Sequence, residues 1–200
     1  STAPGVPVDS DGVGLDLAIG GVQKCWAVPP ALALGALSPR AKARMAAHAG
    51  RGWTNDFLSA LKFQDEQKMT NITPAIPQMQ ALRRQIRDIE AAGGMAARFR
   101  THDAMQKLVL DWAAARGLGI LAPAGFRSPS VTSIACEGRF AIAELIAGLM
   151  QAGYFIQPGY GKTAATHWRI GHMGDHTVKC VGELLDGVVV PGRDGRLGPG

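Results

Sequence analysis

The second half of the chain alternates between short apolar runs with strand spacing and longer stretches whose apolar residues recur at helix spacing. Strands are predicted at residues 118–121, 130–135, 154–157 and 166–170. Helical stripes between and after them are formed by Ile142, Leu145, Ile146 and Leu149, and by Val178, Val181 and Leu185. This alternation is typical of α/β architecture and predicts a compact domain of about a hundred residues.

The first quarter of the chain is more broken by turns. Strands are predicted at residues 15–19 and 31–37, and the pair Gly20-Gly21 ends the first of them. A helix over residues 40–49 is indicated by Ser38 as N-cap, Pro39 at the first helical position and Gly50 after the last turn. Residues 51–69 are irregular and polar, which predicts a long surface loop.

Two longer helices are predicted in the middle of the chain. Thr73-Pro74 repeats the cap-then-proline signal, and the helix that follows is expected to end at Gly93-Gly94. The next helix is expected to end at Gly117. Their apolar stripes are Met79, Leu82, Ile86 and Ile89 in the first helix, and Met105, Leu108, Trp112 and Ala115 in the second.

Composition excludes several classes of protein. Apolar residues are 46% of the 200, enough to bury a core, which excludes a disordered or fibrous chain. The formal charge of +5 suits anionic ligands, but the basic residues form no run, so we expect no nucleic-acid partner. The longest apolar stretch, residues 25–37, contains Pro29 and Pro30 and falls short of the ~20 residues of a membrane helix, so we expect no membrane partner.

Cysteine and histidine positions indicate neither a disulfide framework nor a metal site. Three cysteines without a C-x-x-C pair predict a reducing, cytoplasmic setting. Histidines at positions 167, 172 and 176 have no acidic partner at metal-ligand spacing, so we expect no metal. Gly161-Lys162-Thr163 is not a phosphate-binding P-loop, because the required glycine five positions earlier is Ile156.

Lys24 follows a predicted strand and a double glycine and has apolar neighbours on both sides. Burial disfavours the ammonium form, and a neutral lysine amine forms imines with carbonyl compounds. The alternative is an ordinary surface lysine whose stem lies on apolar residues. For the adjacent Cys25, packing in the core is the more frequent role than nucleophilic chemistry.

Arg169 lies in the predicted strand 166–170, where Trp168 and Ile170 would face one side while His167 and Arg169 face the other. An arginine fork suits a bidentate carboxylate, although a structural salt bridge is an equally ordinary role. The helix start at Thr73-Pro74 could bind a phosphate. An imine-forming lysine, a phosphate-binding helix start and a carboxylate-binding arginine together indicate pyridoxal 5'-phosphate (PLP) and an amino acid.

Eight segments of the chain resemble the class V aminotransferases of the alanine/serine–glyoxylate (or serine–pyruvate) type, and they occur in the order of that family. The segments are residues 15–17, 23–24, 28–30, 73–76, 81–83, 127–132, 159–162 and 169–174. The resemblance implies an α/β protein of the PLP-dependent transferase fold type I. It assigns residues 1–75 to the end of the large PLP-binding domain, 76–95 to an interdomain helix, 96–190 to a small C-terminal α/β domain and 191–200 to a flexible tail.

The resemblance also implies roles for four residues. Lys24 corresponds to the lysine that forms the Schiff base with PLP, and Gln23 to the neighbour that helps to hold the cofactor phosphate. Thr73 corresponds to a threonine that reaches the phosphate across a homodimer interface, and Arg169 to the arginine that binds the substrate α-carboxylate. The expected reaction is transamination between a small amino acid, alanine or serine, and a 2-oxo acid, glyoxylate or pyruvate.

The family places further cofactor-binding elements before the segment at which this chain begins: an aspartate for the pyridinium nitrogen, a Gly-rich phosphate loop and an aromatic that stacks on the ring. We therefore expect these 200 residues to be the C-terminal part of a longer enzyme. Two alternatives stay open. The chain could be a truncated, catalytically inactive dimerisation or scaffold module of the same fold, or a transaminase for another donor such as aspartate. Gln23 disfavours the desulfurases of this fold, which usually have histidine there.

Overall fold

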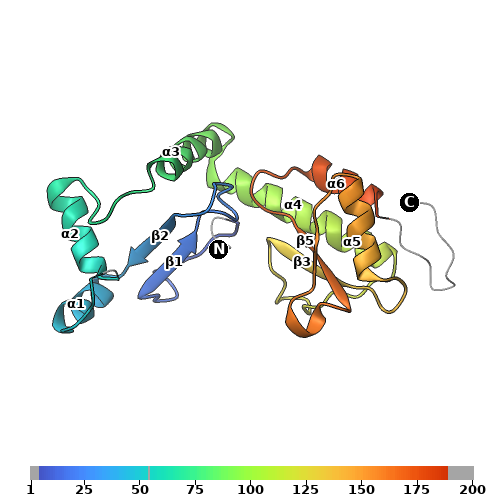
Figure 1. Ribbon diagram of the computed structural model, residues 1–200, viewed down its shortest axis with the longest axis horizontal. Helices are drawn as coiled ribbons and strands as arrows, with labels where there is room; N and C mark the ends of the chain where they lie inside the picture. The colour runs from blue at the N-terminus through green and yellow to red at the C-terminus, as the bar shows by residue number, and fades with distance from the viewer. Residues whose placement is uncertain (1–4, 54, 189–200) are drawn as a thin grey trace.

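The first lobe is built on an antiparallel pair of strands. The computed structural model describes residues 5–53 and 55–188. Strand β1 (Leu17–Gly21) pairs with β2 (Ala33–Leu37), from Leu17 opposite Leu37 to Gly21 opposite Ala33. Helices α1 (Pro39–Ala47) and α2 (Phe57–Gln67) follow and lie at the outer end of this lobe (Figure 1).

The helix caps confirm one sequence prediction and correct another. Ser38 caps α1, since its hydroxyl accepts a hydrogen bond from the Ala41 amide at 3.0 Å, with proline at the first helical position. The predicted loop at residues 51–69 is wrong for most of its length, because it contains α2. The carboxylate of Asp56 accepts hydrogen bonds from the amides of Leu58 and Ser59, which stabilises the start of a helix in this polar segment.

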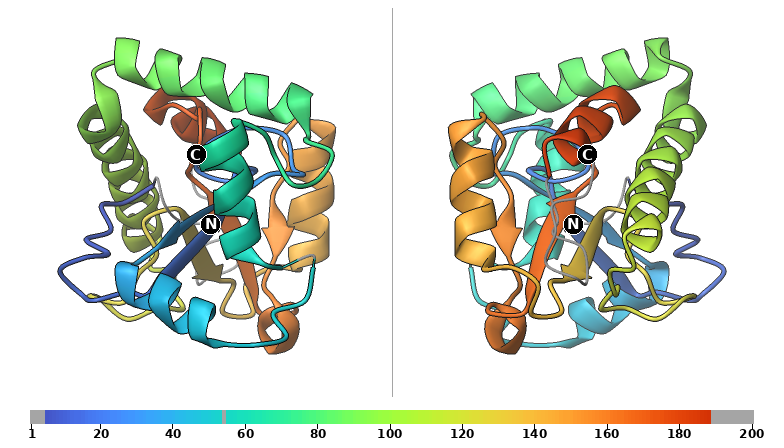
Figure 2. Two further views of the ribbon diagram at one scale, coloured as in Figure 1. Left: turned by 90° about the vertical axis from the view of Figure 1, so that its left-hand side faces the viewer. Right: turned by 90° about the vertical axis from the view of Figure 1, so that its right-hand side faces the viewer.

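Helices α3 (Ile76–Ala91) and α4 (Gly94–Ala115) connect the lobes. Figure 2 shows α3 running across the top of the molecule, with α4 descending from its end. The sharp change of direction uses Gly93 and Gly94, which both have positive φ, a conformation that glycine adopts without steric cost. The predicted cap at Thr73 is wrong: α3 begins three residues later, after Ala75, and has no side-chain cap.

The second lobe is a three-stranded antiparallel sheet with helices on one face. Strand β5 (His167–Gly171) lies between β3 (Val131–Ala135) and β4 (Gln157–Pro158). Helices α4, α5 (Ile142–Gln151) and α6 (Val178–Asp186) pack their apolar faces on it, and a short 3₁₀ helix, η1 (Gly161–Thr163), precedes β5. The strand predicted at residues 118–121 is reduced to one bridge between Ile120 and Ile134, and the one predicted at 154–157 becomes the two-residue β4.

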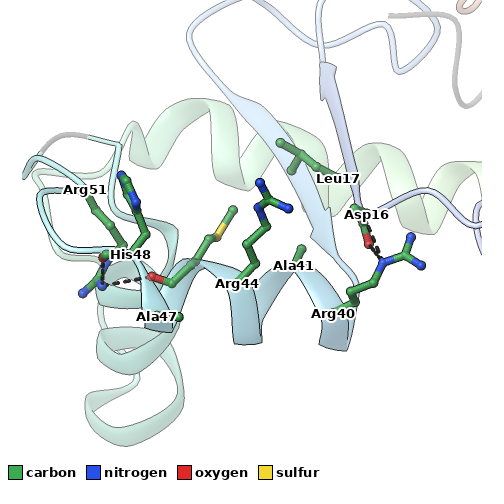
Figure 3. A pocket seen from close by; sticks show the side chains of 9 residues that line it. Asp16, Leu17, Arg40, Ala41, Arg44, Ala47, His48 and Arg51 are labelled. Atoms are coloured by element: carbon green, nitrogen blue, oxygen red, sulfur yellow. Dashed lines mark hydrogen bonds and ion pairs between the residues drawn. The ribbon is translucent and has the colours of Figure 1, made fainter.

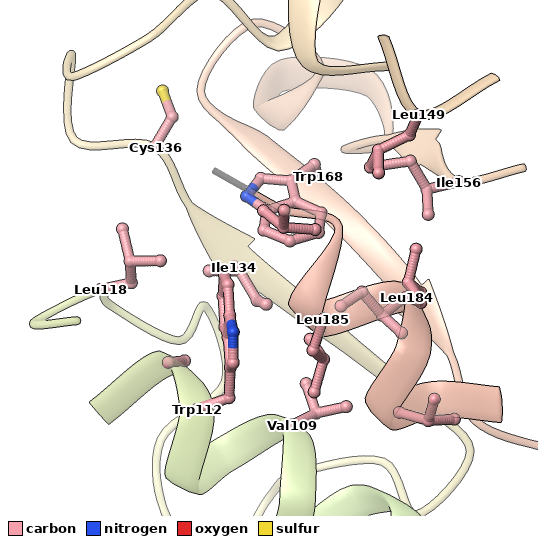
Figure 4. Close-up of a cluster of buried hydrophobic side chains, with 14 of the residues drawn as sticks. Val109, Trp112, Leu118, Ile134, Cys136, Leu149, Ile156, Trp168, Leu184 and Leu185 are labelled. Carbon is pink, nitrogen blue, oxygen red and sulfur yellow. The ribbon is translucent and has the colours of Figure 1, made fainter. Parts of the chain in front are cut away.

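Two tryptophans lie at the centre of the hydrophobic core of the second lobe (Figure 4). The rings of Trp112 and Trp168 meet edge to face, with centroids 6.0 Å apart and planes at 88°. An aromatic contact of this kind adds about 0.5–1.5 kcal/mol to the stability that burial of the rings provides. The fully buried residues around them include Met105, Val109, Ile134, Ile170 and Leu185.

Burial alternates along β5 as the sequence predicts. Trp168 and Ile170 are buried beneath the helices, whereas His167 and Arg169 are half-buried on the opposite face of the sheet. Arg169 is therefore presented on the face that the helices leave uncovered.

The predicted domain boundaries at residues 75, 95 and 190 stay predictions, and the predicted tail at 191–200 lies outside the described residues. No helix in the described part of the chain combines the length and the apolar character needed to cross a bilayer.

Candidate active site

A tight turn after β1 presents Lys24. The amide of Ala27 donates to the carbonyl of Lys24 at 2.9 Å, and the amide of Val28 donates to that of Val22 at 3.2 Å. Val22 and Cys25 are fully buried, and they anchor the turn, whereas Lys24 is exposed. Of the two alternatives for Lys24, the structure shows the surface lysine and not the buried one, because the apolar neighbours occupy the inward positions of the turn. The expectation that Cys25 serves in packing is confirmed.

Lys24 and Gln23 line an open cavity of about 490 Å³. The facing wall is formed by Gly171 at the end of β5 and by four residues of the loop that follows it, Met173, Gly174, Asp175 and His176. Sites for small molecules and cofactors typically have volumes of roughly 300–1,000 Å³. Within the described residues the Lys24 amine has no hydrogen-bond or ion-pair partner. The amine is therefore available to a ligand in a cavity of suitable size.

Arg169 lies on strand β5, and the last residue of that strand, Gly171, lines the cavity. It stands two residues before Gly171 and on the same face of β5, because side chains alternate along a strand. Its Nε donates to the carbonyl of Pro158 at 2.8 Å, which fixes the guanidinium against β4. Among the described residues its two Nη groups have no protein partner, so the end of the fork remains open to an anion.

Thr73 lies in a different hollow. It is exposed and lines a surface depression of about 1250 Å³ formed by the ends of α2 and α3 and the segment between them. Large exposed apolar side chains surround it: Trp53, Met69, Ile72, Ile76 and Met79. Gln23 and Lys24 thus line one cavity, Arg169 lies on the strand whose last residue, Gly171, lines the same cavity, and Thr73 lines a separate depression.

Four polar residues that no sequence motif indicates stabilise the loop after β5, and one of them, Arg98, also binds the Lys24 turn. Arg98 of α4 hydrogen-bonds both the carbonyl of Cys25 and the carboxylate of Asp175, and Gln85 of α3 donates to the same carboxylate at 2.7 Å. The ring of His102 is fully buried and contacts the carbonyl of Gly174 at 3.3 Å. These partners are more than 70 positions apart in the chain, so no local spacing predicts them.

His172 has a structural environment, not a metal-binding one. It is fully buried, and its Nε2 lies 2.9 Å from the hydroxyl of Thr132. Burial is the main cause that lowers the pKa of His172 to about 4, so the ring is neutral at physiological pH. Within the described residues, no group of three or more His, Cys, Asp or Glu side chains is arranged to hold a metal ion.

A second surface depression, of about 720 Å³, lies along α1 and is rich in arginine (Figure 3). Arg40 pairs with Asp16 at 2.8 Å and lowers the pKa of that carboxyl, while Arg51 donates to the carbonyls of Met45 and His48. Figure 3 shows Arg44 between these two sets of contacts. None of the predicted site residues lines this depression, so we assign it no part in the reaction expected at Lys24.

The chain is similar in sequence to several transaminases. No family model matches the chain. It is 26% identical over 190 residues to a 2-aminoethylphosphonate–pyruvate transaminase from Aeromonas hydrophila, an alignment that covers 90% of this chain and 49% of the relative. It is also 26% identical over 197 residues to the (S)-ureidoglycine–glyoxylate transaminase of Bacillus subtilis, covering 87% of this chain and 47% of the relative.

Solved structures agree with the sequence relatives. The ureidoglycine–glyoxylate aminotransferase of B. subtilis superposes with a TM-score of 0.78 at 28% identity, covering 93% of this chain and 48% of that one. Alanine–glyoxylate aminotransferase from Nostoc sp. gives a TM-score of 0.84 at 23% identity, covering 92% and 50%. The homologues of this chain are thus class V-type PLP-dependent aminotransferases, and its fold is the α/β fold type I that the motifs predict. The chain spans about half the length of the relatives it matches.

Proposed function

We propose that this chain supplies the lysine and the substrate-binding arginine of a PLP-dependent transaminase. The observation that carries the proposal is the cavity in which Lys24 and Gln23 face the loop that continues from the Arg169 strand. An unpaired amine suits the cofactor aldehyde, and the open guanidinium of Arg169 suits the carboxylate of an amino acid. The donor set at the cavity therefore fits the cofactor.

Lys24 has two tasks in this proposal. Its Nζ would hold the cofactor aldehyde covalently, with release of water. As a free amine it would then act as the general base that removes the proton from the substrate Cα. Bound PLP supplies an electron sink that stabilises the carbanion at Cα. The exposure of Lys24 at the cavity gives its four-carbon stem room to move between these two positions.

Arg169 orients the substrate. Its Nε is held by the carbonyl of Pro158, so its remaining N–H groups point in a fixed direction and can bind the α-carboxylate of the amino acid. Orientation of this kind sets which Cα bond lies where Lys24 can remove a proton. The same fork later binds the carboxylate of the 2-oxo acid when the reaction runs in reverse.

Gln23 and Thr73 are proposed to hold the cofactor phosphate from two subunits of a homodimer. Gln23 stands beside Lys24 at the cavity, and its amide can donate to a phosphate oxygen. Thr73 lies in a separate depression bordered by exposed apolar side chains, a kind of surface that often marks a protein interface. Its distance from Lys24 within one chain is consistent with a role at the site of a partner subunit.

For the substrates we propose a small amino acid, alanine or serine, as donor and glyoxylate or pyruvate as acceptor. The named relatives use pyruvate or glyoxylate as acceptor, which supports this choice. Aspartate and 2-aminoethylphosphonate are the competing donors, because the open arginine fork suits any planar or tetrahedral oxyanion. Turnover of L-alanine, L-serine, L-aspartate and 2-aminoethylphosphonate with each acceptor ranks these donors directly.

Replacement of Lys24 by alanine tests the proposal in the full-length protein with PLP added. We expect amino transfer to fall to background in Lys24→Ala, and the exposed Lys107 on α4 provides the control, since Lys107→Ala should transfer at the normal rate. Survival of transfer in Lys24→Ala would contradict the proposal. An absence of transfer in the unsubstituted protein, with all donors, would favour the catalytically inactive module instead.

A further inference from the structure

We propose that Arg98 is a positioning residue that sets the distance between Lys24 and the wall of the cavity that leads to Arg169. The inference rests on the proposed function and extends it to a residue that does not line the Lys24 cavity. Arg98 lies on α4, and its side chain is only 10% exposed. Its guanidinium therefore lies between the elements that build the cavity and not on the surface.

A single guanidinium binds both walls. Nε and Nη2 of Arg98 donate to the carbonyl of Cys25 at 3.1 and 2.7 Å, and Cys25 directly follows Lys24. Nη2 also donates to the carboxylate of Asp175 at 3.0 Å, in the loop that continues from β5. In the described part of the chain, Arg98 is the side chain that hydrogen-bonds both the Lys24 turn and this loop.

The two walls pack so closely that a small displacement changes the cavity. A Cβ atom at Gly174 would lie 3.3 Å from the carbonyl oxygen of Lys24 and 3.2 Å from the Cβ of Ala27. His102 contacts the carbonyl of Gly174 from α4, and Gln85 binds Asp175 from α3. The loop is thus held by both helices, and Arg98 adds the direct link to the Lys24 turn.

The contact between Arg98 and the turn is a buried one. Cys25 is fully buried, so its carbonyl would lack a charged donor if the guanidinium were removed, and an unsatisfied buried carbonyl favours opening of the turn. Asp175 is 58% exposed, and its contribution is weaker because solvent screens the pair. The carbonyl bonds, more than the ion pair, are therefore what places Lys24.

The experiment compares Arg98→Met with Arg84→Met in the full-length protein. Arg84 lies on α3, 78% exposed in an ion pair with Asp88, and serves as the matched control. Without cofactor, we expect amide hydrogen exchange in residues 22–28 to rise about tenfold or more in Arg98→Met, which corresponds to loss of one buried hydrogen bond. With PLP and amino acid, we expect kcat to fall about a hundredfold, as for a displacement of roughly 1 Å, with little change in KM.

Two further variants separate the effect of the Cys25 carbonyl bonds from that of the Asp175 ion pair. Arg98→Lys retains the charge but not the fork, so it should restore exchange and kcat only in part, and it replaces Arg98→Met if that variant does not fold. Asp175→Asn leaves the Cys25 bonds intact and should change both readouts less than either Arg98 variant. Arg98 variants indistinguishable from Arg84→Met in exchange and kcat would overturn the inference. Failure of the unsubstituted protein to transaminate would instead overturn the proposed function. The exchange result would still show whether Arg98 stabilises the Lys24 turn.

Discussion

Gly174 lies against the turn that carries Lys24, and a Cβ at Gly174 would stand 3.3 Å from the Lys24 carbonyl oxygen. The two residues are 150 positions apart, yet they form opposite walls of one cavity. Their backbones can approach this closely because Gly174 has no side chain and adopts a φ of +72°. The shape of the cavity therefore depends on the lack of a Cβ atom at position 174.

The first prediction concerns this contact. Gly174→Ala should destabilise the protein and impair amino transfer, because alanine at positive φ costs about 1–2 kcal/mol and the Cβ pushes on the Lys24 turn. Gly138 has the same φ of +72°, and a Cβ there would have no neighbour within 4 Å, so Gly138→Ala measures the backbone cost alone. Urea unfolding of both variants separates the two contributions. Equal destabilisation, with equal activity, would contradict a functional contact at Gly174.

The second prediction concerns acid stability. The pKa of His172 is lowered by burial from an ordinary 6.5 to about 4, so only the unfolded chain takes up this proton between those pH values. The stability that neutral His172 provides is present above pH 6.5 and is lost as the pH falls towards 4, by roughly 3 kcal/mol in total.

Replacement of this histidine tests the pH dependence. In His172→Gln the amide can still bond Thr132, and the slope of unfolding free energy between pH 6.5 and 4 should become shallower. His48→Gln, at an exposed histidine, is measured alongside as the control substitution. An unchanged slope in His172→Gln would show that another group is responsible for the acid loss.

The third prediction concerns the core of the second lobe. Trp168→Ala should cost about 3–5 kcal/mol, because it removes a fully buried ring and its edge-to-face contact with Trp112. Phe126 is 82% exposed, and Phe126→Ala should change the unfolding free energy by less than about 0.5 kcal/mol. Thermal or urea unfolding provides the comparison. A cost no greater than that of the surface substitution would contradict the central place of Trp168.

The fourth prediction separates capping from cofactor binding. Asp56→Ala should destabilise the protein by about 1 kcal/mol, because Asp56 caps α2. Thr73→Ala should leave stability unchanged, since Thr73 caps no helix, but it should weaken PLP binding if Thr73 reaches the phosphate in a dimer. Urea unfolding and a PLP titration give the two values. Unchanged PLP affinity in Thr73→Ala would remove Thr73 from the proposed site.

Local patterns predict most of the helices and strands. Ser38-Pro39 identifies the start of α1, and the alternation around Trp168 identifies both β5 and the face on which Arg169 lies. The pattern failed at α2, where Asp56 supplies a cap within a polar segment, and at Thr73, where Pro74 precedes the helix without starting it. At both places the start of the helix depends on whether a side chain caps it. The periodicity of apolar residues contains no information on such a hydrogen bond.

The site was predictable only in part, for a related physical reason. The motif predicts Gln23 and Lys24 as site residues, but the exposure of Lys24 follows from the tertiary packing of Val22 and Cys25. The Arg98 contacts join segments more than 70 residues apart, and composition or spacing carries no information on such pairs. Long-range hydrogen bonds of this kind become visible only when the fold places their partners together.

Mapping the lysine to which PLP attaches shows whether Lys24 binds the cofactor. The full-length protein is incubated with PLP, reduced with borohydride and digested, and the modified lysine is located by mass spectrometry. We predict modification of the peptide that contains Lys24, and its loss in Lys24→Ala but not in Lys107→Ala. Modification of a different lysine, such as Lys162, or an unmodified Lys24 in a protein that still transaminates, would contradict it.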